Sequence, residues 1–166
     1  MKEFEIKPRI YFDEGSLEYL REVKSKNAFI LSDGIMEKLG YLKQAVDFLE
    51  SAGVQCDVYT NIKPEPDLLA VMDSLEHYMV HQGHTVIALG GGSAMDTAKA
   101  MIYFLHQAVS KTGKSFNKPQ FIAIPTTSGT GSEVTDFSVI TINGKKTALI
   151  DDLMAPDIAI LDSTCT

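Results

Sequence analysis

The chain contains 166 residues, of which 45% are hydrophobic and 22% are charged, and its formal net charge is −7. This composition is typical of a globular protein and excludes an intrinsically disordered chain. The negative charge argues against a nucleic-acid partner, and no apolar run approaches the roughly 18 residues that a membrane span needs. We therefore expect one domain over residues 1–166, with no nucleic-acid partner and no membrane partner.

The two cysteines, Cys56 and Cys165, are far apart in the sequence and form no CxxC motif. The N-terminus alternates charged and apolar residues and lacks the basic and apolar regions of a secretory signal. Sparse cysteines are typical of proteins in a reducing compartment. These features together predict a cytoplasmic location.

Short β-rich runs alternate with segments of helical period along most of the chain. This alternation is typical of a parallel sheet covered by helices. The predicted strands are, in chain order, Arg9–Phe12, Asn27–Leu31, 54–58, Thr85–Leu89, Gln120–Ile124 and Ile158–Leu161. Helices are predicted after Gly15, around 42–49, from Pro66 to Gly83 with an apolar face of Leu68, Met72, Leu75 and Met79, and over 94–105.

Asn143-Gly144 stands between two short β-rich runs in the last third of the chain. Asn-Gly is a strong hairpin signal because both central positions of a type I′ turn need positive φ. The sequence therefore predicts an α/β fold: a Rossmann-like, doubly wound, mostly parallel sheet with helices on both faces and a β-hairpin near the C-terminus.

A glycine-rich turn, Gly90-Gly91-Gly92-Ser93, lies between a predicted buried strand and a helix. Glycines allow backbone N–H groups to approach an anion, and the helix N-terminus adds positive potential, so this turn predicts a phosphate site. The alternative is an ordinary tight turn. The usual GxGxxG fingerprint is absent, because Met95 stands where its last glycine would be.

A second polar segment, residues 125–133, follows the next predicted strand and is rich in threonine, serine and glycine. Its hydroxyl groups can bind a phosphate or a ribose without carrying charge. The alternative is a flexible linker. Because two such loops at the carboxyl ends of parallel strands suit one ligand lying across the sheet, we predict a shared dinucleotide site.

Asp33 ends the second predicted strand. A carboxylate at this position can accept hydrogen bonds from both ribose hydroxyls and would repel a 2′-phosphate, which favours NAD over NADP. The alternative is a plain turn aspartate.

Other sequence features suggest no catalytic centre. His77, His81 and His84 have a helical spacing, but no carboxylate completes a metal site, so a solvated face is the preferred interpretation. Gly113-Lys114-Ser115 lacks the first glycine of a phosphate-binding Walker loop, and no GxSxG motif occurs. The chain thus shows a binding apparatus without a visible reactive group.

Two long motifs together resemble those of the iron-containing, group III alcohol dehydrogenases. Residues 90–99 match GGGSxxDxAK, and residues 125–135 match PTTxGTGSEVT. The segment 8–17 is similar to that family's first strand and turn, and 156–162 resembles the segment that closes its nucleotide domain. The resemblance covers nearly all of the chain.

The resemblance implies specific roles for residues of this sequence. Gly91, Gly92 and Ser93 would hold the pyrophosphate of NAD, and Asp33 would bind the adenosine ribose. Thr126, Thr127 and Thr130 would border the adenine and the phosphates. Lys146 matches a lysine on the cofactor side, and Asp96 would lie near the nicotinamide end.

Members of this family also have a C-terminal helical domain that holds a divalent metal, usually Fe²⁺ or Zn²⁺. The resemblance implies that this domain is missing from the chain, since its ligands would follow Thr166 and none of the four histidines matches them. The function expected is the NAD(H)-binding half of a metal-dependent alcohol dehydrogenase that interconverts small primary alcohols and aldehydes, inactive by itself. A glycerol or polyol dehydrogenase and a stand-alone, non-catalytic nucleotide-binding module are the alternatives. An apolar face left uncovered would favour a homo-oligomer.

Overall fold

A computed structural model describes residues 1–3 and 5–166 and contains one six-stranded parallel sheet in the order β1-β8-β5-β4-β2-β3. The strands of this sheet are β1 (Arg9–Phe12), β2 (Asn27–Ser32), β3 (Gln55–Tyr59), β4 (Thr85–Gly90), β5 (Gln120–Pro125) and β8 (Ile158–Leu161). A separate antiparallel hairpin comprises β6 (Phe137–Ile142) and β7 (Lys145–Ile150). The predicted fold class is confirmed.

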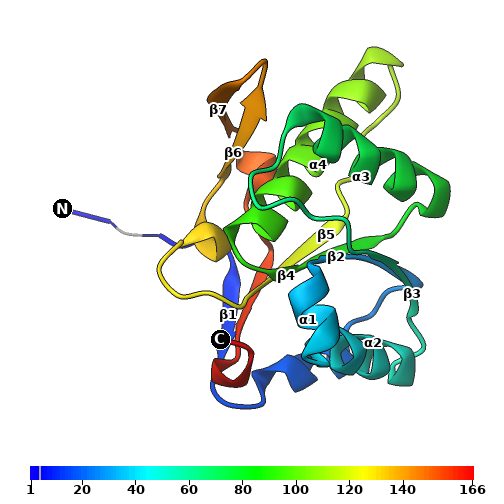
Figure 1. Cartoon of the computed structure of the whole chain (residues 1–166), viewed down its shortest axis with the longest axis vertical. Coiled ribbons are helices and arrows are strands. Elements are labelled where there is room, and N and C mark those ends of the chain that lie inside the picture. The colour runs from blue at the N-terminus through cyan, green and yellow to red at the C-terminus, as the bar shows by residue number, and fades with distance from the viewer. Residues whose placement is uncertain (4) are drawn as a thin grey trace.

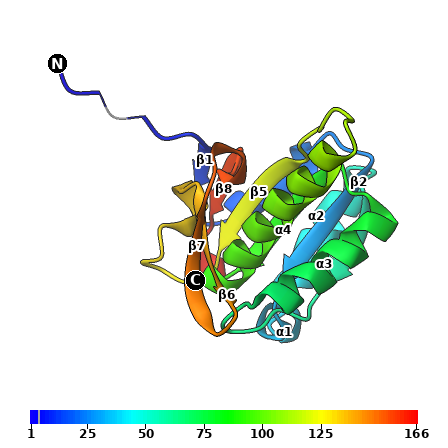
Figure 2. The same ribbon diagram turned by 90° about the horizontal axis from the view of Figure 1, so that it is seen from above.

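Helices cover both faces of the sheet (Figure 1). They are α1 (Gly34–Lys38), α2 (Tyr41–Ser51), α3 (Leu68–His81) and α4 (Gly92–Lys111), together with a 3₁₀ helix over Ser16–Glu22 and short 3₁₀ turns at Ser132–Val134, Asp152–Met154 and Ser163–Cys165. The first 3₁₀ helix, α1 and α2 pack on one face, whereas α3 and α4 pack on the other. Figure 2 shows α3 and α4 side by side along the strands.

The central strands are apolar on both sides because both faces are covered. In β2, Ala28 and Ile30 belong to the core beneath α2, while Phe29 and Leu31 belong to the core beneath α3 and α4. Every residue of β4 is buried. This explains why the strands read in the sequence as continuous apolar runs.

Two details of the predicted helices are wrong. Helix α1 was not predicted, because its five residues show no periodicity and it is nucleated by the Asp33 side chain, which accepts the N–H groups of Ile35 and Met36. Met79 was placed on the buried face of α3 but is 47% exposed. The buried face includes Ser74, whose hydroxyl donates to the Val71 carbonyl. Because serine is polar, the sequence pattern did not assign this position to the buried face.

The hairpin turn has the predicted geometry, with φ of 50° at Asn143 and 74° at Gly144. The hairpin packs against α4 and stands beside the main sheet (Figures 1 and 2). Among residues 1–3 and 5–166, no helix combines the length and the apolar character needed to cross a bilayer.

Gly83 lies where the chain turns from α3 into β4. A substitution there tests how closely this turn packs against β2. A Cβ at this position would lie 2.9 Å from the Phe29 backbone nitrogen and 3.1 Å from the Thr85 carbonyl oxygen. Because neither backbone atom can move freely, Gly83→Ala is expected to lower the free energy of unfolding by about 1–3 kcal/mol in urea denaturation. The control is Gly34→Ala, where no atom lies within 4 Å, and an equal loss in both variants would contradict this account.

Candidate dinucleotide-binding site

The carboxyl ends of β2, β4 and β5 meet at one edge of the sheet, where a cavity of about 700 Å³ opens. The strand order reverses here, because β2 leads outward to β3 and β4 leads to β5 on the other side. Doubly wound sheets bind ligands in such a crevice. Six of the predicted ligand residues line it: Asp33, Gly91, Gly92, Ser93, Thr126 and Thr127.

The N-terminus of α4 opens into this cavity. Gly91 is the N-cap residue, and no side chain caps the helix. The first N–H groups of a helix have no partner within the helix and carry partial positive charge. This 20-residue helix therefore presents donors suited to an anion such as a phosphate.

Glycine is needed in this turn because its neighbours approach closely. A Cβ at Gly90 would lie 2.8 Å from Ala94 Cβ and 3.2 Å from Asp33 Oδ2, and a Cβ at Gly91 would lie 3.3 Å from Thr127 Oγ1. A Cβ at Gly92 would lie 3.5 Å from Thr130 Cγ2. The turn is thus held between the Asp33 carboxylate and the threonine-rich loop.

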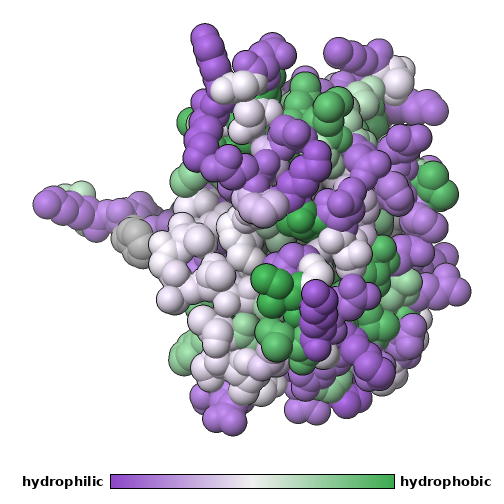
Figure 3. Space-filling view, viewed as in Figure 1, coloured by the Kyte–Doolittle hydropathy of each residue, from purple (hydrophilic) through white to green (hydrophobic). Residues whose placement is uncertain are grey.

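This loop, which we call the threonine loop (residues 126–131), follows β5 directly. Strands β4 and β5 pair as far as Gly90 and Pro125, and Thr126 donates its N–H to the Gly90 carbonyl oxygen at 3.0 Å. Positive φ at Gly129 and Gly131 turns the chain back toward α4. In Figure 3 a pale, weakly polar surface covers the loop, and apolar surface lies next to it in the region of α1.

The Asp33 carboxylate has two separate tasks. Its Oδ1 accepts the N–H groups of Ile35 at 2.9 Å and Met36 at 3.0 Å, which caps α1. Its Oδ2 lies over Gly90 at the cavity wall. One oxygen stabilises the helix, the other lies next to the glycine turn, and the residue lines the cavity.

A second cavity of about 250 Å³ adjoins the first and shares Pro64 and Ser93 with it. It contains the other two predicted residues on this side, Asp96 and Lys146. Lys146 Nζ lies 3.3 Å from a carboxylate oxygen of Glu65, and both side chains are largely exposed. The structure therefore places Asp33 in the lining of the first cavity and Lys146 in that of the second, and Ser93 lines both.

Several lining residues were not predicted from the sequence, among them Ile35, Lys38, Ile62 and Lys63. The segment 61–66 crosses over the glycine turn, where the Ser93 hydroxyl donates to the Pro64 carbonyl. Its other end is fixed because the Pro66 carbonyl accepts the Thr141 N–H at 2.9 Å. Two prolines in six residues indicate a rigid segment. The sequence around them, however, gives no sign of which part of the fold this segment covers.

Two charged groups of α4 lie close to these cavities: Asp96 lines the second one, and Lys99 is buried one turn further along the helix. Burial raises the pKa of Asp96 to about 6, although Lys99 and the Val139 N–H favour the carboxylate. Burial lowers the pKa of Lys99 to about 8, against the attraction of Asp96, Asp136 and Glu133. Both groups thus change charge closer to neutral pH than their ordinary counterparts.

The histidines with helical spacing lie outside this site. His77 Nδ1 lies 3.8 Å from Asp73, His81 Nδ1 lies 3.1 Å from Asp57, and His84 bonds Asn27. In the part of the chain that the structure describes, no group of three or more His, Cys, Asp or Glu residues could hold a metal ion.

A doubly wound sheet with an uncapped helix at its switch point defines an α/β domain of the kind in which ligands bind at the ends of the strands. The comparisons with known proteins agree, because the family model "Iron-containing alcohol dehydrogenase" matches residues 7–163. The chain therefore belongs to the iron-containing alcohol dehydrogenase family, as its two motifs predicted.

Individual relatives support this assignment. The chain is 36% identical to the "NADPH-dependent butanol dehydrogenase" of Clostridium saccharobutylicum, over 98% of this chain and 45% of that protein. The iron-containing alcohol dehydrogenase of Thermococcus thioreducens superposes with a TM-score of 0.86 at 32% identity, over 96% of this chain and 46% of that one. A sulfoacetaldehyde reductase of Bifidobacterium kashiwanohense, solved with NAD⁺, superposes with a TM-score of 0.86 at 29% identity. The match covers 100% of this chain and 47% of that one. The chain spans less than half the length of the curated relatives it matches.

The raised pKa of Asp96 predicts how stability depends on pH. Between its ordinary value of 3.8 and about 6, the folded protein holds a proton that the unfolded chain has released, so Asp96 makes stability fall as pH rises through this window. Asp96→Asn removes this effect. The variant is expected to be more stable than the parent by about 1 kcal/mol near pH 8, after allowing for solvent screening, and the gain should vanish below about pH 4.

Urea denaturation at a series of pH values measures this difference. Asp47→Asn, at an exposed position on α2, is the matched control. A gain for Asp96→Asn that is the same at every pH would show that the carboxylate is not the cause.

Proposed function

We propose that residues 1–166 form the NAD(H)-binding domain of a metal-dependent alcohol dehydrogenase that interconverts small primary alcohols and aldehydes by hydride transfer. The observation that carries this proposal is the uncapped N-terminus of α4, which faces the larger cavity between Asp33 and the threonine loop. Membership of the iron-containing alcohol dehydrogenase family gives the reaction class. The relative solved with NAD⁺ supports the choice of ligand.

In this proposal each part of the site has one task. The N–H groups at Gly92 and Ser93 bind the pyrophosphate, and the hydroxyls of Thr126, Thr127 and Thr130 border the phosphates and the adenosine. Asp33 Oδ2 accepts the hydroxyls of the adenosine ribose. The dinucleotide then continues past Ser93 into the second cavity, where Asp96 and Lys146 contact its nicotinamide half. The bound cofactor supplies the hydride chemistry, and the protein fixes its position.

The described residues do not fit a metal ion, because no suitable group of side chains comes together among them. The family's divalent metal, Fe²⁺ or Zn²⁺, is proposed to bind outside residues 1–166.

We also propose that the protein forms a homo-oligomer and works in the cytoplasm. Phe12 on the edge strand β1 and Ile150 at the end of β7 are each 74% exposed, and an open strand edge with apolar side chains favours association. Cys56 and Cys165 are free thiols, which fits a reducing compartment.

Replacement of Asp33 by asparagine, the corresponding amide, tests the proposed role of its carboxylate. Asp33→Asn keeps an oxygen that can cap α1 but removes the charge facing the ribose. The ratio of the NADPH to the NADH dissociation constant should fall by about tenfold or more, which corresponds to about 1.5 kcal/mol for a charged hydrogen-bond partner. Isothermal titration calorimetry measures both constants.

Asp151→Asn is the control, since Asp151 also caps a helical turn with its side chain but lies away from both cavities. Binding of the two cofactors with equal affinity by the unmodified chain would contradict the role of Asp33. Failure to bind either cofactor would overturn the proposed function.

The proposed division of labour predicts that the 166-residue chain cannot turn over alcohol alone. With NAD⁺, 1-propanol or 1-butanol, and added Fe²⁺ or Zn²⁺, we expect no formation of NADH above a protein-free blank, because the described residues provide no set of metal ligands. Absorbance of NADH follows the reaction. Turnover that depends on the added metal would mean that the metal site lies within this chain.

A further inference from the structure

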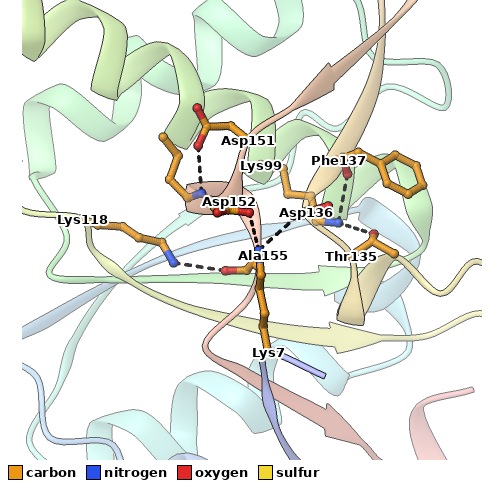
Figure 4. A network of polar contacts seen from close by, with 10 residues as sticks. Lys7, Lys99, Lys118, Thr135, Asp136, Phe137, Asp151, Asp152 and Ala155 are labelled. Atoms are coloured by element: carbon orange, nitrogen blue, oxygen red, sulfur yellow. Dashed lines mark hydrogen bonds and ion pairs between the residues drawn. The ribbon is translucent and has the colours of Figure 1, made fainter. Parts of the chain in front are cut away.

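Lys99, on the third turn of α4, is completely buried, with 0% of its surface exposed. A buried ammonium group is destabilising unless it is hydrogen-bonded. Its Nζ donates to the Ser132 carbonyl at 2.6 Å, to Ser132 Oγ at 3.2 Å, to Thr135 Oγ1 at 3.0 Å and to the Phe137 carbonyl at 3.1 Å. Figure 4 shows the side chain reaching from the helix to Thr135 and Phe137.

All four acceptors belong to one stretch of chain, residues 132–137, which leads from the threonine loop into β6. The loop is fixed at its start by the bond between Thr126 and Gly90. At its other end, Lys99 fixes the residues that follow Gly131. The helix that carries Lys99 begins at the glycine turn, so this side chain connects the two turns through a rigid element.

Strand β6 has an additional link to α4 that does not involve Lys99. The Ser138 hydroxyl donates to the Asp96 carbonyl at 2.8 Å, and the Val139 N–H bonds the Asp96 carboxylate. Loss of the Lys99 ammonium group should therefore loosen residues 127–135 while β6 stays in place.

We propose that Lys99 is a positioning residue: it holds the threonine loop at the distance from the glycine turn at which both can contact one dinucleotide. Lys99 is too deeply buried to touch the ligand, and it acts through Thr127 and Thr130, which lie against Gly91 and Gly92. The ligand part of this inference depends on the proposed function. The mechanical part, that Lys99 holds the loop, does not.

The chain offers a matched control in Lys118. Its side chain is 26% exposed, and its Nζ lies 3.3 Å from Asp157 Oδ2. The same Nζ donates to the Ala155 carbonyl at 3.1 Å (Figure 4). It thus ties two chain segments together as Lys99 does, but next to the amino ends of β5 and β8, away from the cavities. Lys118→Met removes a comparable cation without disturbing the proposed site.

The experiment compares Lys99→Met, Lys99→Arg and Lys118→Met in the 166-residue chain. Hydrogen exchange without ligand should show amides of 127–135 exchanging at least tenfold faster in Lys99→Met, with the strand amides of β4 and β6 unchanged. The NADH dissociation constant, measured well below the midpoint of thermal unfolding, should rise at least tenfold. Lys99→Arg, which keeps the donors, should recover part of both effects, whereas Lys118→Met should lower thermal stability with NADH affinity within twofold of the parent.

If Lys99→Met does not fold, Thr135→Val replaces it, since it removes one of the acceptors at nearly constant volume. It should weaken NADH binding by about two- to fivefold. Unchanged exchange in 127–135 would overturn the mechanical role of Lys99. Unchanged NADH affinity in both variants, or equal losses in the Lys99 and Lys118 variants, would overturn the positioning role alone, whereas no NADH binding by the parent chain would overturn the proposed function and with it the ligand role.

Discussion

The site depends on the close approach of two backbone turns at the ends of adjacent parallel strands. Thr126 bonds the Gly90 carbonyl, and Thr127 and Thr130 lie close enough to Gly91 and Gly92 that a Cβ there would be 3.3 Å and 3.5 Å from them. This contact keeps the uncapped end of α4 open to the cavity, because neither turn can collapse onto it. Gly90 is therefore required for the turn itself, and a Cβ at Gly91 would press on the loop that lies against it.

Charge is distributed unevenly around this contact. The chain as a whole is acidic, yet the cavity receives the positive end of α4, and Lys38 and Lys63 are among its lining residues, the latter with its ammonium group 3.6 Å from Asp67. The Asp33 carboxylate lies at one end of the cavity. This arrangement suits a ligand with a negative centre and a neutral polyhydroxylated end, which is the chemistry of a pyrophosphate joined to a ribose.

Features that depend on residues close together in the sequence were predicted well. The strands, the Asn143-Gly144 turn and the placement of both loops at strand ends follow from local propensity and periodicity. The segment 61–66 could be recognised as rigid, but its position over Ser93 depends on tertiary packing. Lys99 lies within a recognised motif, but its hydrogen bonds to residues 132–137 could not be predicted, because these acceptors lie 33 to 38 residues further along the chain.

The family resemblance supplied what spacing alone left open. The residues themselves indicated a phosphate-binding turn, a polar loop and one dinucleotide site shared between them, and the two motifs added the family, its reaction class and the roles expected of Asp96 and Lys146. Helix α1 was missed because a single carboxylate, that of Asp33, starts it, and short helices of this kind leave no periodic trace. For Asp33, the ribose-binding role was thus predicted from its place at the end of a strand, although its capping of α1 was not.

The topology of the sheet also affects how the protein is made. Strand β1 is the first to leave the ribosome, but its partner in the described sheet is β8, at residues 158–161. At about 5–20 residues per second, β1 waits on the order of ten seconds for that partner to be synthesised. The unit from β2 to β5 contains mutually paired strands and can form during this interval. The crevice at the ends of β2, β4 and β5 can therefore form in the nascent chain before the outer part of the sheet is complete.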